Sequence, residues 1–325
     1  MLLMAIFFIR QQHLEFAQIR QQLNNSNGTY ILLGVILTII YVLAQAQMYV
    51  HSFKALHKDI SLFTALILFL KRNLVSLFLP AGGFTSLAFF NTDLEEKGIS
   101  KSKIYLASTL YGFCGILSVV FVALPVLAFA LLTTQIGTLE ILSFGFVLVI
   151  TGALALIINS ISKKGIAFKY ILKLKPSLAA ILEDMLEERI NRKQFWYTLA
   201  VSVGIECIGI AHLYICMLAL HFQASLPAAI IGYIVMVILL IASPFLRGLG
   251  TIEVALTFIL RQFGFPIIAA ASITLLFRFF EFWLPLIGGI ISFITKKNSL
   301  VLRVLPAFII LVLGAVNILS SITPA

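Results

Sequence analysis

The sequence predicts an all-α, polytopic membrane protein with no soluble domain. Of its 325 residues, 61% are apolar and only 11% are charged, whereas soluble domains carry roughly 25% charged residues. Long apolar stretches recur along the whole chain, and polar residues gather between them. This composition excludes an ordinary soluble enzyme, a disordered chain and a nucleic-acid-binding domain, because lipid must be the main solvent of such a protein.

The apolar stretches define the expected helices, since about 20 apolar residues can cross a bilayer as a helix. The uninterrupted stretches are 30–50, 104–132, 139–161, 195–221, 266–294 and 304–320. Two further stretches, 60–90 and 225–262, are apolar but interrupted. We therefore expect about seven or eight transmembrane helices and two broken, re-entrant helical hairpins of opposite orientation. Residues 1–303 would form one membrane domain, and 304–325 an additional transmembrane helix.

The charges between these stretches predict how the chain is oriented. Lys and Arg are frequent in the loops 51–59, 91–103, 162–194 and 295–303, and absent from 133–138 and 222–226. The positive-inside rule places the basic loops in the cytoplasm. The net charge of +10 therefore indicates membrane topology and contact with anionic lipid headgroups.

The stretch 60–90 cannot be a single crossing, because the loops on both of its sides are basic. Its middle contains Pro80, Gly82 and Gly83, which break a helix. We expect a re-entrant hairpin that enters from the cytoplasmic side.

The stretch 225–262 has its own break, marked by Pro244, Gly248 and Gly250. It begins on the outer side, so it is either a second hairpin or two crossings. Two opposed hairpins would match the inverted repeats of transporters. Irregular backbone at membrane depth needs protein or a water-filled cavity around it, so the breaks indicate a polar interior site. The alternative is a helix kinked for packing alone.

The loop 162–194 contains an amphipathic stretch at 176–190. Pro176 suits the first turn of a helix, and apolar residues follow at helical spacing. We expect a helix at the cytoplasmic membrane surface; a solvated connector is the alternative.

Several charged residues fall inside apolar stretches, where a charge costs roughly 2.5–3.5 kcal/mol on insertion scales. With their polar neighbour Asn73, these candidates for a lipid-binding and translocation site are Lys71, Arg72, Asn73, Glu206, Arg247, Glu253, Arg278 and Glu281. Arginine matches phosphate oxygens with a bidentate fork, so a phosphate-bearing, lipid-like ligand would suit. The alternative is internal ion pairing, for example between Arg278 and Glu281, which share a helix face.

Motifs for other chemistry are not found in the sequence. His212 and Cys216 share a helix face, but two ligands do not make a metal site, and we expect neither metal nor cofactor. No nucleophile motif or phosphate-binding loop occurs, so we expect no catalytic site. An intramembrane enzyme acting on a polyprenyl phosphate remains a minor alternative.

The two breaks and their order resemble a known family. Lys71-Arg72-Asn73 before Leu79-Pro80-Ala81-Gly82-Gly83-Phe84, and Arg247-Gly248-Leu249-Gly250-Thr251-Ile252-Glu253 farther on, are similar to signatures of the lysylphosphatidylglycerol synthase transmembrane-region family. Leu276-Phe277-Arg278 and Leu284-Pro285-Leu286-Ile287-Gly288-Gly289 follow in the family's order. The resemblance covers roughly residues 10–295.

The resemblance implies a function. In the bacterial multiple peptide resistance factors, the membrane part is a flippase for aminoacylated phosphatidylglycerol, and a cytoplasmic C-terminal domain synthesises that lipid. We therefore expect a flippase domain in the bacterial inner membrane that moves lysyl- or alanyl-phosphatidylglycerol outward and gives resistance to cationic antimicrobial peptides. We expect transferase activity only if a C-terminal synthase domain exists in a longer natural protein.

The expected partners follow from this reading. They are an anionic or aminoacylated phospholipid, the membrane, a synthase domain in cis or trans, and a second copy in a homo-oligomer; nucleic acid is not expected. The alternative function is a non-transporting membrane scaffold for a phosphatidylglycerol lysyltransferase or a glycosyltransferase.

Overall fold

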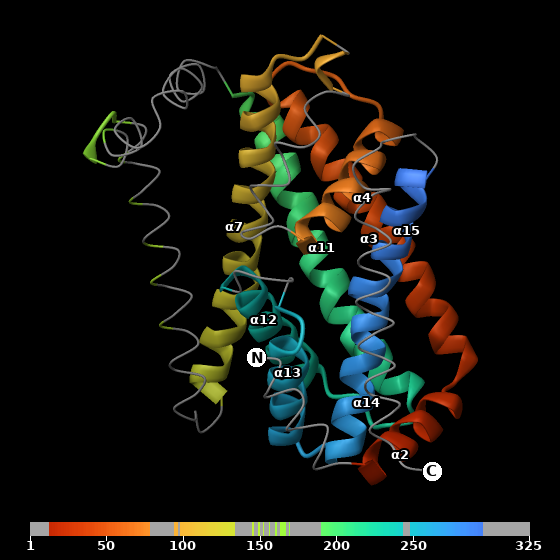
Figure 1. Ribbon diagram of the computed structural model, residues 1–325. Helices are drawn as coiled ribbons and strands as arrows, with labels where there is room; N and C mark the ends of the chain where they lie inside the picture. Colours follow the sequence, from red (N-terminus) through yellow and green to blue (C-terminus); the bar gives the residue numbers. More distant parts are fainter. Residues whose placement is uncertain are drawn as a thin grey trace.

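The computed structural model describes residues 13–78, 94–96, 98–133, 190–242 and 248–294, with scattered positions between 145 and 169. Every regular element in these ranges is helical. The α-helices are α2 (His13–Asn24), α3 (Gly28–Lys54), α4 (Leu62–Phe78), α7 (Lys101–Thr133), α11 (Arg192–Ala219), α12 (Leu226–Ala242), α13 (Thr251–Gln262), α14 (Ile267–Arg278) and α15 (Leu284–Ile294) (Figure 1). The π-helical turn η2 (Phe279–Trp283) joins α14 to α15.

Within the described residues, four helices are long and apolar enough to cross a membrane. They are Gly28–Lys54, Lys101–Pro125, Arg192–Ala219 and Ile267–Ser292. These helices confirm the predicted stretches 30–50, 104–132, 195–221 and 266–294. Nearly all of the predicted stretch 139–161, the whole of 304–320 and the amphipathic segment 176–190 up to residue 189 lie outside the described residues.

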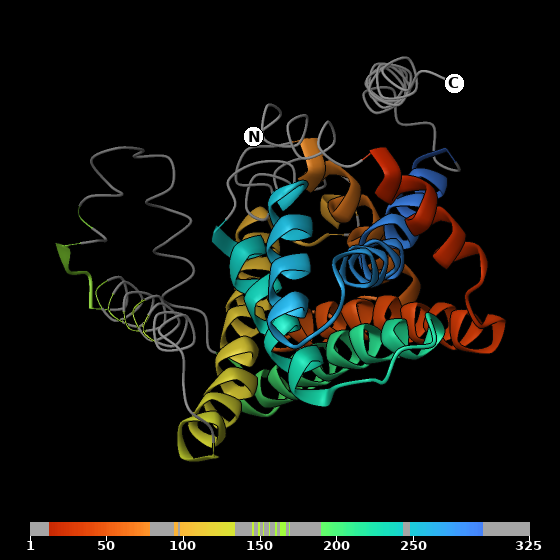
Figure 2. The same cartoon turned by 90° about the horizontal axis from the view of Figure 1, so that it is seen from below.

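Helices α3 and α11 form an antiparallel pair and lie side by side along one face of the bundle (Figure 2). At one end, the Asn191 amide donates to the Ala55 carbonyl oxygen at 2.8 Å. At the other end, the Asn27 amide donates to the Ala219 carbonyl oxygen, also at 2.8 Å. Both asparagines also cap the helix that follows them with their side chains, a preferred role for this residue. The pair is thus fixed at both ends.

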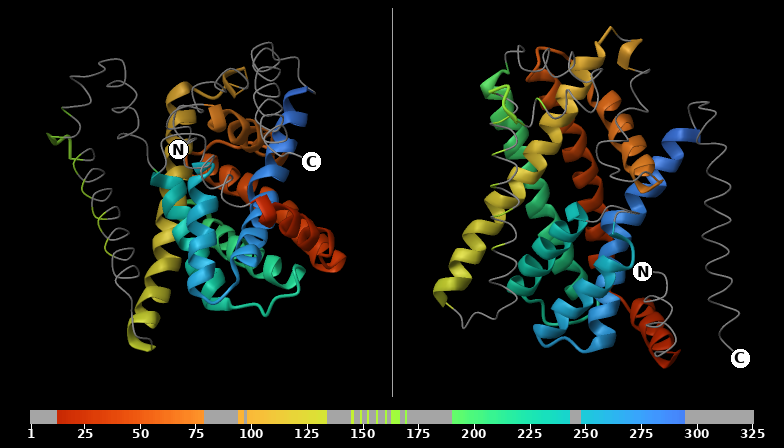
Figure 3. Two further views of the ribbon diagram at one scale, coloured as in Figure 1. Left: turned by 60° about the horizontal axis from the view of Figure 1, so that its bottom comes forward. Right: turned by 60° about the vertical axis from the view of Figure 1, so that its left-hand side comes forward.

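Short helices occupy each half of the bundle. Helix α4 lies in the upper half of Figure 1, and α12 with α13 lies in the lower half. Helices α12 and α13 pack against each other. The loop before α12 and the loop after α13 line one shallow depression, which includes Ser225, Pro227 and Gly264. The two helices therefore start and end at the same end of the molecule (Figure 3).

The segment from α14 to α15 is continuous despite its π-helical turn. The Leu284 amide donates to the carbonyl oxygen of Phe279, five residues earlier. Helix α15 packs closely on α4, since a Cβ atom at Gly289 would lie 2.8 Å from the Leu70 carbonyl oxygen. Glycine permits this close approach, so α15, the last described helix, lies against α4.

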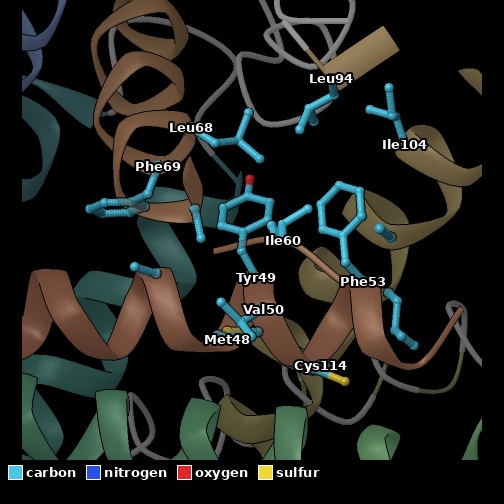
Figure 4. Packing of buried hydrophobic residues seen from close by; sticks show 14 of the residues in the cluster. Met48, Tyr49, Val50, Phe53, Ile60, Leu68, Phe69, Leu94, Ile104 and Cys114 are labelled. Atoms are coloured by element: carbon cyan, nitrogen blue, oxygen red, sulfur yellow. The ribbon is translucent and has the colours of Figure 1, made fainter. Parts of the chain in front are cut away.

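Two large apolar clusters fill the bundle. The first, at the upper end, surrounds Tyr49 and Phe53 of α3, together with Leu68, Leu94 and Ile104 (Figure 4). The second lies at the lower end, where α11, α12, α13 and α14 meet. Polar side chains buried in and between these clusters form the candidate site.

Candidate functional site

An arginine–glutamate pair lies beside the second break. The Nε atom of Arg278 on α14 donates to Oε1 of Glu253 on α13 at 2.8 Å. The Arg278 side chain is 4% exposed and that of Glu253 is 23% exposed. The guanidinium carbon also lies 4.5 Å from the ring centroid of Phe282. A second donor, Nη2 of Arg278, is buried and has no hydrogen-bond partner among the described residues.

The backbone at the start of α13 fixes Glu253. The amide of Gly250 donates to Glu253 Oε2 at 2.6 Å, so this carboxylate caps the helix N-terminus, where negative charge is favoured. Gly248 and Gly250 have φ angles of 71° and 84°, a region that side chains other than glycine rarely adopt. The Gly-Leu-Gly sequence thus positions Glu253 in front of Arg278. Pro244 and Arg247 lie outside the described residues.

Glu281 does not pair with Arg278, contrary to the expected alternative. Its Oε1 atom lies 2.7 Å from Nδ1 of His212 on α11. The His212 side chain is fully buried and that of Glu281 is 9% exposed. The other ring nitrogen, Nε2, lies 3.2 Å from the Gly34 carbonyl oxygen and from the Thr38 hydroxyl.

The π-helical turn explains this difference. In an α-helix, residues three apart share a face. The wider π-helical turn rotates each residue by a smaller angle, so Arg278 and Glu281 point to different neighbours. Arg278 faces α13, and Glu281 faces α11.

Glu206 lies inside the bundle among hydroxyl groups. Its Oε1 atom accepts from Ser118 on α7 at 3.0 Å, and its Oε2 atom accepts from Tyr233 on α12 at 2.9 Å. The residue is 7% exposed. Gly209, one turn later, contacts the Tyr233 ring so closely that a Cβ atom would lie 2.0 Å from Cε2. This close approach brings α12 against the polar face of α11.

Arg72 belongs to a third group, on the upper side of the bundle. Its Nη1 atom donates to the Tyr49 hydroxyl, and its guanidinium carbon lies 4.9 Å from the ring centroid of Tyr111. The two tyrosine rings stack with centroids 4.0 Å apart, and Tyr111 donates to Gln45. Arg72 thus joins α4 to α3 and α7 through a cation–π contact.

The neighbours of Arg72 are buried as well. Lys71 is 1% exposed and Asn73 is 5% exposed. The break that follows them, with Pro80, Gly82 and Gly83, lies outside the described residues. The structure therefore distributes the candidates that it describes over three groups, around Arg278, Glu281 with Glu206, and Arg72.

Sequence reasoning found the charged residues but missed their partners. His212 was considered only as a metal ligand, and Tyr233, Ser118, Tyr49 and Tyr111 were not considered. A signal existed for one further member of the group, Ser202, which lies four residues before Glu206 on the same face of α11 and contacts Ser118. The neighbours on other helices gave no such signal, since pairing between helices depends on the fold.

The fold and the buried charged pairs define a multi-pass helical membrane protein with a polar interior. The chain belongs to the lysylphosphatidylglycerol synthase TM region family, which it matches over residues 1–289. This match confirms the resemblance stated from the sequence. A comparison with curated protein sequences finds no match.

Proposed function

We propose that this chain is a lipid flippase domain that moves aminoacylated phosphatidylglycerol from the inner to the outer leaflet. The observation that carries the proposal is Arg278, a buried guanidinium with one donor held by Glu253 and another without a partner. An incomplete hydrogen-bond set on a buried charge is costly, and a ligand with anionic oxygens would complete it. Membership in the lysylphosphatidylglycerol synthase TM region family supports a lipid as that ligand.

The Arg278–Glu253 pair is complementary in charge to an aminoacylated headgroup, which carries an anionic phosphate and a cationic ammonium group. The lipid phosphate would bind the guanidinium of Arg278, because arginine and phosphate form strong charge-assisted hydrogen bonds. The ammonium of the aminoacyl group would bind the carboxylate of Glu253, which is the more exposed partner. Glu206 and Glu281 are enclosed by partners from neighbouring helices, so we assign them no direct contact with the lipid.

The short helices support two opposed hairpins that each enter half of the membrane. Helices α12 and α13 have 17 and 12 residues. At 1.5 Å per residue they are about 25 Å and about 18 Å long, whereas a bilayer core is about 30 Å thick. Their shared loop region at one end fits a re-entrant hairpin with the break at membrane depth. Helix α4 would be the first arm of the opposite hairpin, which the sequence predicts over 60–90.

The charges support an orientation with the upper end in the cytoplasm. Lys54 ends α3 and Lys58 follows it, while Lys101 and Lys103 lie in the first turn of α7. The start of α7 is at the upper end in Figure 1, and basic residues favour the cytoplasmic side. Outward transport in a bacterial inner membrane would then enrich the outer leaflet in cationic headgroups. A less negative surface would repel cationic antimicrobial peptides.

The test is translocation of headgroup-labelled lysyl-phosphatidylglycerol in proteoliposomes. Wild-type protein should move this lipid faster than unmodified phosphatidylglycerol. Arg278→Ala should slow the transfer at least tenfold, since loss of a charge-assisted hydrogen bond costs about 1.5–3 kcal/mol. Arg261→Ala is the matched control, because Arg261 is exposed near the end of α13. Wild-type rates in folded Arg278→Ala protein would remove Arg278 from the mechanism.

A second candidate function is a non-transporting scaffold for a lipid-modifying enzyme. It is favoured by the internal pairing of Arg278 with Glu253 and of His212 with Glu281, because charges can also be retained to hold helices together. The double variant Arg278→Glu/Glu253→Arg separates the two functions. A structural pair should tolerate the exchange, with unfolding temperature restored relative to either single variant. A lipid site should lose transfer even when the fold is restored.

A further inference from the structure

The proposed lipid site does not use Glu206, although this residue is buried between three helices. Two hydroxyl groups contact its carboxyl group, and a third donates to one of these two. Ser118 and Tyr233 contact its two oxygens, and Ser202 donates to the Ser118 oxygen at 2.9 Å. No described Lys, Arg or His side chain forms an ion pair with Glu206. Intramembrane carboxyl groups form the proton relays of many pumps and transporters.

The hydrogen atoms around Ser118 can be counted. Its hydroxyl group has one hydrogen and two acceptors in reach, the Gly115 carbonyl oxygen at 2.8 Å and Glu206 Oε1 at 3.0 Å. If Glu206 is ionised, Ser118 donates to Glu206. If Glu206 is protonated, Glu206 donates to the Ser118 oxygen, and Ser118 donates to Gly115.

Both protonation states therefore have a complete set of hydrogen bonds with the same heavy-atom positions. Rotation of one hydroxyl hydrogen converts one arrangement into the other. Tyr233 donates to Oε2 in both. Glu206 can thus gain and lose a proton without a change in packing, which is the property of a proton-binding site.

The neighbouring His212–Glu281 pair holds its proton differently. Nδ1 of His212 lies 2.7 Å from Glu281 Oε1, so a proton lies between these two atoms. Nε2 lies 3.2 Å from both the Gly34 carbonyl oxygen and the Thr38 hydroxyl. Glu281 thus shares a proton with a ring nitrogen, whereas the side-chain partners of Glu206 among the described residues are hydroxyl groups.

Helices α3, α7, α12, α14 and the turn η2 all pack on α11. Their ionisable side chains include Tyr41 on α3, Cys114 on α7, Tyr233 on α12, Arg278 at the end of α14 and Glu281 on η2, and α11 itself carries His212 and Cys216. Tyr233 contacts Glu206 directly. Glu206 and Glu281 interact electrostatically, whereas Arg278 is held by Glu253. The site is therefore one carboxyl group among hydroxyl groups, beside a histidine–glutamate pair.

We propose that Glu206 binds a proton that is exchanged for the lipid, so that the chain is a proton–lipid antiporter. This inference rests on the proposed flippase function and adds its energy source. Lysyl-phosphatidylglycerol has a net charge of +1, and an inside-negative potential opposes its outward movement. One proton moving inward for each lipid moving outward balances that charge. No bond other than the O–H bond of Glu206 forms or breaks.

The test imposes a pH gradient across proteoliposomes, with the membrane potential held at zero by potassium and valinomycin. Labelled lysyl-phosphatidylglycerol should accumulate in the leaflet that faces the acidic side, whichever way the protein is inserted. For one pH unit the leaflet ratio should approach about tenfold, since one proton is coupled to one lipid. A protonophore should return the ratio to one.

The variant Glu206→Gln should give a leaflet ratio of one under the same gradient. Glutamine can still donate to Ser118 and accept from Tyr233, so this variant keeps the packing. Thr198→Val is the matched control, because Thr198 is equally buried on α11 and lies two turns before Glu206; it should keep the wild-type ratio. Lipid transfer that ignores the gradient in wild-type protein would overturn the antiport while leaving the flippase in place. No transfer under any condition would overturn both.

Infrared spectroscopy gives a measurement that needs no transport. Lowering the pH should produce the carbonyl stretching band of a protonated carboxyl group in wild-type protein and in Thr198→Val. The component that Glu206 contributes should be absent from Glu206→Gln, whereas the bands of the other carboxyl groups persist. Identical bands in wild-type protein and Glu206→Gln would assign the proton to another group and overturn the inference.

Discussion

At the residue scale, Glu206, Glu281 and Arg278 each have a hydrogen-bond partner on another helix. His212 and Glu281 are 69 positions apart in the sequence and 2.7 Å apart in the structure. Removing one partner of such a pair leaves the other charge or polar atom buried, which is more costly than removing both. The buried polar groups therefore specify how α3, α11 and η2 fit together.

This reasoning predicts the order of stability among variants of the pair. His212→Leu should lower the free energy of unfolding by about 3–5 kcal/mol, because Glu281 loses its partner. Glu281→Gln should cost less, because the amide oxygen still accepts from Nδ1. The double variant His212→Leu/Glu281→Leu should be more stable than His212→Leu alone. Thermal unfolding in detergent measures these differences, and equal midpoints for all three variants would contradict the coupling.

At the element scale, close approach at glycine residues determines which helix faces meet. The Cβ atom of an alanine at Gly209 would overlap the Tyr233 ring, which itself donates to Glu206. The contact of α11 with α12 and the position of a buried carboxyl group are thus set by the same glycine.

Two alanine variants on α11 should therefore change the stability of the protein in opposite directions. Gly209→Ala should destabilise the protein by about 1–3 kcal/mol, because an overpacked contact forces the helices apart. Gly204→Ala is the control, since nothing lies within 4 Å of a Cβ atom there; it should be neutral or stabilising by up to about 1 kcal/mol, because alanine favours the helix. Unfolding midpoints of the two variants test the prediction. A stable Gly209→Ala variant would mean that Tyr233 moves aside without cost.

The elements also show how far the sequence could predict this structure. The length of the apolar stretches was sufficient to predict α3, α7, α11 and the α14–α15 segment, because a helix that crosses a bilayer requires such a stretch. The polar helix α2 was missed, because it has no apolar run and is stabilised by packing on α14. The π-helical turn was missed too, and with it the directions of Arg278 and Glu281, because no residue pattern distinguishes Phe279–Trp283 from an ordinary helix.

At the scale of the whole molecule, the described part of the second break, Gly248 and Gly250, lies beside the Arg278–Glu253 pair. Irregular backbone at membrane depth requires polar surroundings, and Gly250 meets that requirement through Glu253. The sequence could place this break but not the side chain that faces it, since Arg278 lies on another helix, 25 positions after its partner Glu253. The proposed transport path requires Arg278 to lie beside this break. That arrangement depends on the hairpin geometry of α12 and α13, in which α12 begins and α13 ends at the same end of the molecule.

Labelling with a membrane-impermeant thiol reagent tests this topology. Gln223→Cys, before α12, and Gln262→Cys, at the end of α13, should both react from outside the cell, whereas Lys58→Cys should react only after the membrane is opened. The wild-type chain is the control, because Cys114 and Cys216 are buried and Cys207 lies in the middle of α11. Labelling of positions 223 and 262 from opposite sides would show that 225–262 crosses the membrane once. The re-entrant hairpin would then be wrong, and the Arg278–Glu253 pair would need another route to each leaflet.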